Sequence, residues 1–399
     1  MSSYDPTGTH RTDPHTFYRW ARDHSPVVWS EEIGVWLVAD YELVTEVLRR
    51  PDMFSSAQSF TPLDALPPEI LRILDHLPLP PHMVQADPPQ HAPLRAVGER
   101  ILHGRRISAA IPALRGLADD LVDGFAADGH ADLLTQYAHP FVRTALAELT
   151  GFDHADADRL DEWNGAFLTL AAPVGDPAAK VAAAHALLDY DAHILDALED
   201  RRREPREDIL TELARLVADD DADMDPADAV MFVRGLYAGG IHTTRDAIAV
   251  TVMSALTHGL WDQASDPRAV AGLVEEALRH EAPHRGMMRV LVSDTVLGGV
   301  EMAAGSRVLL LFGSANRDAH VFAAADDFTP GRANARQHVA FGAGIHRCLG
   351  RALARLEIRI AVEALSRLPG LRLPEGYEPD WSPEWYFRAL RRLDVHWDT

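Results

Sequence analysis

The feature that most constrains this chain is the segment around its single cysteine, residues 341–350, which read FGAGIHRCLG. Its three glycines permit tight turns and a close approach of the backbone to a flat ligand. Cys348 stands just before a predicted helix, whose positive end favours a thiolate, and His346 and Arg347 add positive charge nearby. Such a thiolate is either a nucleophile or a metal ligand. Because the chain of 399 residues has no second cysteine, an internal disulfide or a site of several cysteines is excluded.

The composition limits the kinds of partner that the chain can bind. Of its residues, 47% are hydrophobic, so a large core can form, and the net charge is −22. This acidic balance argues against nucleic acid and against an anionic membrane surface. No window approaches the roughly 20 apolar residues of a membrane span, and residues 1–22 carry no hydrophobic signal region. We therefore expect a cytoplasmic protein with no nucleic-acid and no membrane partner.

Hydrophobic periodicity predicts a mainly helical chain with small β-sheets, the α+β class, and a single domain over residues 1–399. Strand-like runs cover 26–29, 35–38, 290–292, 308–312 and 395–397, and helices are expected at 41–50, within 88–218, and at 226–256, 266–280 and 350–369. Residues 53–86 are expected to be largely irregular, and 219–225 to form an acidic turn. The helix that begins at Pro226, with Asp225 as its cap, should be about 30 residues or roughly 45 Å long.

Other patterns accompany the cysteine segment. Glu276 and Arg279 can pair on one helix face, as can His91 and Arg95 at a spacing of four residues. Standing alone, each of these would more often be an exposed surface group than a site residue. Within the longest predicted helix lie the glycines 239–240, which cost roughly 1 kcal/mol each relative to alanine. They make sense where a helix must open or let a ligand approach.

Residues 341–350 match every fixed position of the haem-ligand loop of the cytochrome P-450 family, Phe-Gly-x-Gly-x-His-x-Cys-x-Gly. The resemblance implies that family's fold: one triangular helical domain, with haem b between a long distal helix and the cysteine loop. It also implies that Cys348 is the fifth ligand of the iron and that His346 contacts a haem propionate. Phe341 would pack beneath the haem near the sulfur, and Gly342 would also contact the cofactor.

The same resemblance gives Glu276 and Arg279 a structural role. They match the family's Glu-x-x-Arg signature, which a further arginine completes as a buried ion-pair network. Arg332 is the candidate for this third partner. Arg336 is the alternative, because the spacing from Arg332 to His338 is one residue longer than we expect.

The resemblance also implies which residues bind the haem propionates. His91 and Arg95 would hold one propionate, and Arg289, ten residues after Arg279, would make another propionate contact. Arginine suits carboxylates because its planar fork can bind them with two hydrogen bonds. Whether His338 also faces the propionates is left open.

The glycine pair lies in a segment that resembles the family's distal helix, where Gly239 would face the cofactor. Thr243 corresponds to the threonine that supports protonation of oxygen. His242 occupies the place of the usual Asp or Glu, which is thought to relay protons. Histidine can also relay protons, and Arg245 and Asp246 could re-route them. Two interpretations stay open: His242 tunes or replaces proton delivery, or it is a tolerated substitution that points elsewhere.

The activity that the resemblance implies is insertion of one atom of dioxygen into a hydrophobic or aromatic small molecule, by hydroxylation or O-dealkylation. By family position, the substrate would be lined by Val233, Leu236, Tyr237 and Phe387. The chain has no dinucleotide-binding fingerprint and no cysteine set for an iron–sulfur cluster. We therefore expect electrons from a separate ferredoxin or flavodoxin. Five basic residues could form its docking patch or be scattered charges: Arg105, Arg106, Arg347, Arg351 and Arg355.

Three rival functions stay open from the sequence. An enzyme that uses peroxide directly, or performs coupling or reduction, would fit the departure at His242. A haem protein that only senses or sequesters a ligand fits poorly with the retention of Thr243. A cysteine hydrolase built on Cys348 and His346 would leave the arginine and glycine patterns unexplained.

Overall fold

The structure is a computed structural model, and it describes residues 4–5, 8, 10, 12–59, 66–74, 82–172, 176–218, 224–382 and 387–399. Helices dominate, and the strands among these residues form small sheets, which confirms the mainly helical α+β class. The chain divides into two compact units: unit 1 comprises Met1–Ser56, Ile111–Phe141 and His242–Thr399, and unit 2 comprises Ala57–Ala110 and Val142–Ile241. The single domain over residues 1–399 stays a prediction.

The main sheet of unit 1 has five strands in the order β1-β2-β8-β5-β3. They span Val27–Ser30 (β1), Val35–Val38 (β2), Arg307–Leu311 (β8), Gly286–Leu291 (β5) and Phe54–Ser55 (β3). Strands β2 and β8 run parallel, with Trp36 opposite Val308, whereas the other neighbours are antiparallel. Because the strands are rich in β-branched and aliphatic residues, they bury Val38, Val308 and Leu310 completely in a common core.

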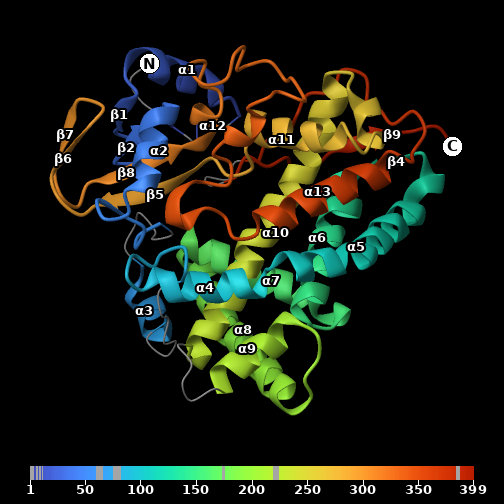
Figure 1. Ribbon diagram of the computed structural model, residues 1–399, viewed down its shortest axis with the longest axis horizontal. Helices are drawn as coiled ribbons and strands as arrows, with labels where there is room; N and C mark the ends of the chain where they lie inside the picture. The colour runs from blue at the N-terminus through green and yellow to red at the C-terminus, as the bar shows by residue number, and fades with distance from the viewer. Residues whose placement is uncertain are drawn as a thin grey trace. The chain divides into compact units, whose positions relative to one another are not determined.

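Five helices of unit 1 are α1 (His15–His24), α2 (Tyr41–Arg49), α11 (Val270–His280), α12 (Phe312–Ala315) and α13 (Arg351–Leu365). Figure 1 shows α1, α2 and α12 beside the sheet. Helix α2 illustrates why they form: the Asp40 carboxylate caps it by accepting the Leu43 N–H at 2.7 Å. Its apolar face then buries Val44, Val47 and Leu48 in the core of the sheet.

Unit 2 is helical, with α3 (Pro68–Leu74), α4 (His91–Ile101), α7 (Ala157–Ala171), α8 (Pro177–Arg203) and α9 (Ile209–Ala218). Asp176 caps α8 by accepting the N–H groups of Ala178 and Ala179, and Pro177 takes the first helical position. Helices α7 and α8 pack through Trp163 and Tyr190, whose stacked rings lie 5.3 Å apart.

Three helices continue from one unit into the other along the chain: α5 (Gly104–Phe125), α6 (His139–Thr150) and α10 (Pro226–Thr257). Helix α10 has 32 residues, so the predicted range of 226–256 is correct to within one residue. Apolar side chains are buried around most of its circumference, as in a helix enclosed by protein. In the described part of the chain, no helix is both long and apolar enough to cross a membrane.

The structure differs from the sequence predictions in several places, among them a hairpin of β6 (Thr295–Leu297) and β7 (Val300–Met302) where only turns were expected. Helix α3 lies in the stretch expected to be irregular, because Pro67 and Pro68 can open a helix as well as a loop. Strand β4 (His130–Asp132) interrupts the predicted helical stretch by pairing with β9 (Asp394–His396), near the C-terminus. Strand β5 begins at Gly286 rather than Val290, since it pairs with β8 along its whole length. The predicted acidic turn lies mostly outside the described residues.

Candidate functional site

The loop before α13 presents Cys348 at the N-terminal end of that helix. The Cys348 N–H donates to the Phe341 carbonyl at 2.8 Å, which closes the loop on itself. The Cys348 carbonyl accepts a hydrogen bond from the guanidinium of Arg351, the first residue of α13, at 3.0 Å. The cysteine is half-buried, so its sulfur can reach a ligand while the helix dipole favours the thiolate.

The glycines of this loop differ in the backbone conformation and in the surrounding space that require them. Gly342 and Gly344 both have positive φ, 63° and 67°, which favours glycine. A Cβ at Gly344 would overlap the backbone carbonyl of Leu48 in α2, so the loop is seated against that helix. A Cβ at Gly342 or Gly350 would meet nothing within 4 Å. The loop therefore has one face against protein and another that borders open space, as a flat ligand requires.

Phe341 is clamped by two basic side chains. The Arg355 guanidinium lies 4.4 Å from the centre of its ring, and the His338 ring centre is 5.7 Å away. Glu275 of α11 holds both: it accepts from the Arg355 Nη2 at 3.0 Å and lies 3.2 Å from the His338 Nε2. Burial alone would raise the pKa of Glu275, but the hydrogen bonds from His338 and Arg355 outweigh it and lower that pKa to about 2.

The role of Glu275 was not predicted from the sequence. The sequence feature that could have indicated its role is the pair of adjacent acidic residues, Glu275 and Glu276. They lie in a helix that also buries its apolar face. Two neighbouring residues in a helix point in different directions, so two buried carboxylates need two separate sets of partners. His338, whose role was left open, is held by Glu275.

The predicted ion-pair network is present, with Arg332 as its third member. Glu276 and Arg279 are both fully buried and form a bidentate pair at 2.8 and 2.9 Å. The Arg332 Nε lies 3.4 Å from Glu276, which confirms this candidate. Arg336 is 78% exposed and approaches a different carboxylate. Arg279 also donates to backbone carbonyls in the segment 316–327, so the network fixes the chain that leads to the cysteine loop.

The residues expected to bind propionates lie in both units. In unit 1, Arg289 of β5 is 3% exposed and donates to the Met288 carbonyl at 2.7 Å, and His346 is half-buried in the loop. In unit 2, His91 begins α4 and is buried, and burial together with the positive charge of Arg95 lowers the pKa of His91. A buried arginine and a neutral imidazole are suitable donors to carboxylates, but these propionate contacts stay predictions.

In the middle of α10, His242 packs against Phe387 of the C-terminal segment, with ring centres 6.0 Å apart and planes at 26°. Phe387 also meets the edge of His284 at 5.5 Å. The neighbouring Arg245 donates to Asp246, which is fully buried, at 2.7 Å. Unit 1 thus brings together two residues that the sequence analysis had named separately, His242 and Phe387. Thr243 is half-buried beside them in the chain.

The unit 2 part of α10 holds the other predicted lining residues. Val233 and Tyr237 are fully buried, and Leu236 is half-buried. The Tyr237 hydroxyl lies 3.1 Å from the Thr150 hydroxyl, and burial raises the pKa of Tyr237. Tyr237 is therefore a core residue of unit 2, whereas contact of these side chains with a substrate stays a prediction.

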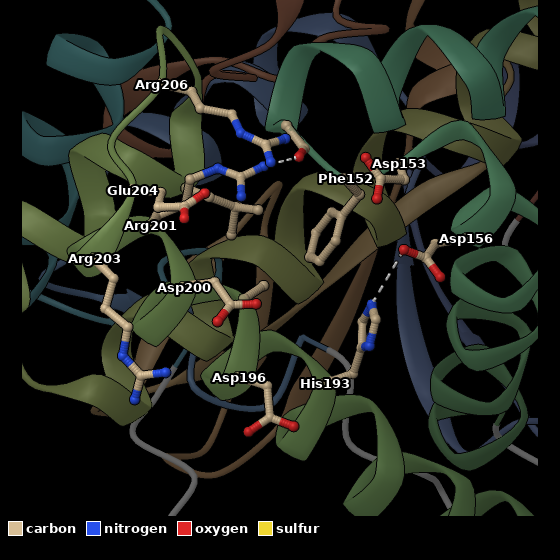
Figure 2. Close-up of a pocket in the computed structure, with 13 residues that line it drawn as sticks. Phe152, Asp153, Asp156, His193, Asp196, Asp200, Arg201, Arg203, Glu204 and Arg206 are labelled. Atoms are coloured by element: carbon tan, nitrogen blue, oxygen red, sulfur yellow. Dashed lines mark hydrogen bonds and ion pairs between the residues drawn. The ribbon is translucent and has the colours of Figure 1, made fainter.

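Unit 2 also contains a polar cavity of about 450 Å³, shown in Figure 2. Carboxylates and guanidinium groups from the end of α8 and from residues 151–156 surround it. Arg201 bridges the Asp208 carboxylate, at 2.6 Å, and the Gly151 carbonyl, and His193 stacks on Phe152. Five carboxylates and three guanidinium groups line the cavity, and none of the predicted site residues is among its lining residues.

Comparison with known proteins gives consistent matches. The family model described as Cytochrome P450 matches residues 269–368. The chain is 31% identical to a steroid C26-monooxygenase of Mycolicibacterium smegmatis, over 90% of this chain and 86% of that protein. It is 33% identical to the cytochrome P450 monooxygenase PikC of Streptomyces venezuelae, over 96% of this chain and 91% of that protein.

The fold is matched equally well. A solved structure of cytochrome P450 CREJ in complex with (4-ethylphenyl) dihydrogen phosphate superposes with a TM-score of 0.93 at 26% identity, over 100% of both chains. The helical architecture of this chain is thus the architecture of a solved cytochrome P450. This chain belongs to the cytochrome P450 family of haem-containing monooxygenases.

Proposed function

We propose that this cytochrome P450 uses haem b to oxidise a hydrophobic or aromatic small molecule, by hydroxylation or O-dealkylation. Its electrons would come from a separate ferredoxin or flavodoxin in the cytoplasm. The observation that carries the proposal is the half-buried Cys348, at the end of a glycine loop and the start of α13, beside open space.

The residues present fit a haem. The open space beside Gly342 and Gly350 leaves room for a flat ring, and Cys348 supplies the thiolate for its iron. Arg289 and His346 in unit 1 would hold propionates, as would His91 and Arg95 in unit 2. Phe341 would pack near the sulfur, and Gly239, whose Cβ position is also open, would border the ring. A thiolate-ligated haem binds dioxygen and favours cleavage of its O–O bond.

His242 and Thr243 would manage protons. Thr243 would hold and donate a proton at its hydroxyl, and His242 would hold and pass a proton at its imidazole. The stack on Phe387 supports this assignment, because a ring packed against another ring keeps one orientation. A tolerated substitution that merely pointed to solvent would not need that contact.

The docking of a redox partner has weaker support. Arg355 and Arg106 are each paired with glutamates of their own units, Glu275 and Glu212, so their charges are partly neutralised. Arg105 and Arg347 are exposed and stay candidates for contact with an acidic partner.

The names of relatives suggest the size of substrate rather than its identity. They include a steroid monooxygenase, a mycinamicin IV hydroxylase/epoxidase and a structure that holds an ethylphenyl phosphate. All three names describe molecules with a substantial carbon skeleton. By analogy, and because the predicted lining residues are apolar, we expect a largely apolar substrate.

A ligand screen tests this proposal. Steroid, macrolide and alkyl-aromatic compounds are titrated into the ferric protein, and shifts of the Soret band are recorded. Compounds that bind are then offered with a ferredoxin, its reductase and reduced nicotinamide, or with hydrogen peroxide alone. We expect oxidised product with the electron-transfer system. Product with peroxide only would favour the peroxide-driven alternative, and binding without consumption of reductant would favour a sensor.

A further inference from the structure

The small sheet of β4 and β9 presents two histidines on its outer face. His130 lies directly opposite His396 in this antiparallel pair, and both residues are exposed. The residues next to them, Ala131 and Val395, also lie opposite each other but are buried. Figure 1 shows the two strands side by side near the C-terminus. Two imidazoles from distant parts of the sequence therefore face solvent together, and both belong to unit 1.

The hydrogen bonds of the ladder bring these two side chains close together. The adjacent pair of residues is Gly129 and Trp397, and the Trp397 N–H donates to the Gly129 carbonyl at 3.1 Å. Hydrogen-bonded and non-hydrogen-bonded pairs alternate along an antiparallel ladder. His130 and His396 therefore form a non-hydrogen-bonded pair, the kind in which opposite side chains approach most closely. Their ring centres lie 6.4 Å apart, with planes at 29°.

The ring of His130 is oriented by the backbone. Its Nδ1 donates to the Asp128 carbonyl at 3.0 Å, because a carbonyl oxygen only accepts. In the neutral imidazole, Nε2 then carries the lone pair. Histidines that bind metals usually have this arrangement, in which the other ring N–H donates to a carbonyl or a carboxylate. The His396 side chain is exposed, so its ring can rotate to meet an ion bound at the His130 Nε2.

The distance between the rings suits a shared metal ion. Zinc binds imidazole nitrogen at about 2.0–2.1 Å, so two imidazoles on one ion have ring centres about 5–6.5 Å apart. The observed 6.4 Å is within this range. Among the residues that the structure describes, no group of three or more histidine, cysteine or carboxylate side chains could hold a metal ion. Water must therefore complete the coordination of an ion at this pair.

The charges around the two histidines favour a cation. Asp132 and Asp394 are the next outward-facing pair of the same strands. Asp132 accepts hydrogen bonds from nearby backbone N–H groups, and Asp394 pairs with Arg392, so neither carboxylate is a direct ligand. Arg372 lies beside the histidine of β9 but pairs with Asp398 at 2.8 Å. In a chain with a net charge of −22, this surface attracts rather than repels a divalent cation.

We propose that His130 and His396 form a binding site for one divalent transition-metal ion, held by a nitrogen of each imidazole and by water. Imidazole suits zinc, copper and nickel, and copper binds most tightly of the three. The ion joins β4 to β9 and so fastens the C-terminal segment, which also carries Phe387. Because the two imidazoles are brought together only in the folded chain, the ion stabilises the fold. The site lies outside the cysteine loop and does not depend on the proposed function.

The experiment is a calorimetric titration of the haem-loaded full chain with Zn²⁺ and with Cu²⁺. We expect one ion per chain, with Cu²⁺ bound more tightly than Zn²⁺. Zn²⁺ at about ten times its dissociation constant should raise the midpoint of thermal unfolding by about 2 °C. His130→Gln and His396→Gln should each weaken binding of Zn²⁺ at least about tenfold and remove the shift in the midpoint.

His24→Gln is the matched control. The His24 ring is exposed and its Nδ1 also contacts a backbone carbonyl, at 2.9 Å, but it stacks on Trp20 rather than on a histidine. This variant should bind Zn²⁺ as the wild type does. If one variant at the proposed site does not fold, judged by circular dichroism, the other decides.

Three outcomes would overturn the proposal. The wild type might bind no Zn²⁺, or both variants at the proposed site might bind Zn²⁺ as tightly as the wild type. The third is a shift of the midpoint with Mg²⁺ as large as that with Zn²⁺, because Mg²⁺ prefers oxygen ligands. Such a shift would come from the acidity of the chain and not from the two imidazoles.

Discussion

We assign both the cysteine loop and the central part of α10 to the proposed haem site, yet the two regions constrain their residues in opposite ways. In the loop, residues are fixed by the backbone and by neighbouring protein: Gly344 must have positive φ and must clear the Leu48 carbonyl. In α10, the backbone is an ordinary helix. Its unusual residues, Gly235 and His242, are explained by the side chains that pack against them, those of His82 and Phe387. Changes in the loop should therefore cost stability, whereas changes in α10 should mainly alter chemistry and specificity.

The largest effect is expected in the network that supports the loop. Arg279→Leu would leave the fully buried Glu276 without its bidentate partner, and removing one member of such a pair costs about 3–5 kcal/mol. The free energy of unfolding is measured by urea denaturation. Arg336→Leu is the control, because this side chain is 78% exposed, and it should cost less than about 0.5 kcal/mol. Similar losses in both variants would show that the network does not support the loop.

The next effect separates two glycines of the loop. Gly344→Ala combines positive φ with overlap of the Leu48 carbonyl, and we expect a loss of about 3 kcal/mol. Gly342→Ala has the same backbone conformation but open space around its Cβ, so it should lose only about 1–2 kcal/mol. Thermal unfolding and retained haem are measured for both. A larger loss in Gly342→Ala would mean that the seat against α2 is unimportant.

Acid should weaken the clamp around Phe341. The pKa of Glu275 is lowered to about 2 in the folded chain, below its value of about 4.3 in the unfolded chain. The stabilisation is therefore complete above about pH 4.3 and is lost as the pH falls toward 2. Glu275→Gln should cost at most about 3 kcal/mol at pH 7 and flatten the fall in stability between those two pH values. The control Glu378→Gln, at an exposed position, should show the same dependence of unfolding free energy on pH as the wild type. If Glu275→Gln also leaves this dependence unchanged, Glu275 does not stabilise the folded chain through His338 and Arg355.

The smallest change in stability is expected on the α10 side. Because the His242 ring packs against Phe387, His242→Ala and His242→Asp should lower the free energy of unfolding by about 0.5–1.5 kcal/mol. Both should nevertheless change the fraction of reductant that is released as peroxide, because proton delivery is altered. His242→Asp should release less peroxide than His242→Ala, since a carboxylate can pass protons. If neither variant changes turnover or peroxide release, His242 is not a proton relay.

Much of the cysteine loop could be predicted from the sequence, because its glycines, cysteine and helix start are local features. The extent of α10 could be predicted for the same reason, from its cap and its apolar run. The pairing of β4 with β9 and the clamp by Glu275 could not, because each joins segments that are far apart in the sequence. The packing of the His82 ring against Gly235 was not predicted either. A glycine within a helix indicates that another group approaches the backbone closely, but the sequence does not show which group it is.

The central claim is that the Cys348 thiolate ligates haem iron, and one spectrum tests it most directly. The haem-loaded full chain is reduced and exposed to carbon monoxide. We predict an absorption band at the position typical of thiolate-ligated haem, and a move to the position of nitrogen-ligated haem in Cys348→His. A wild-type protein that binds haem stoichiometrically but lacks the thiolate band would contradict the claim.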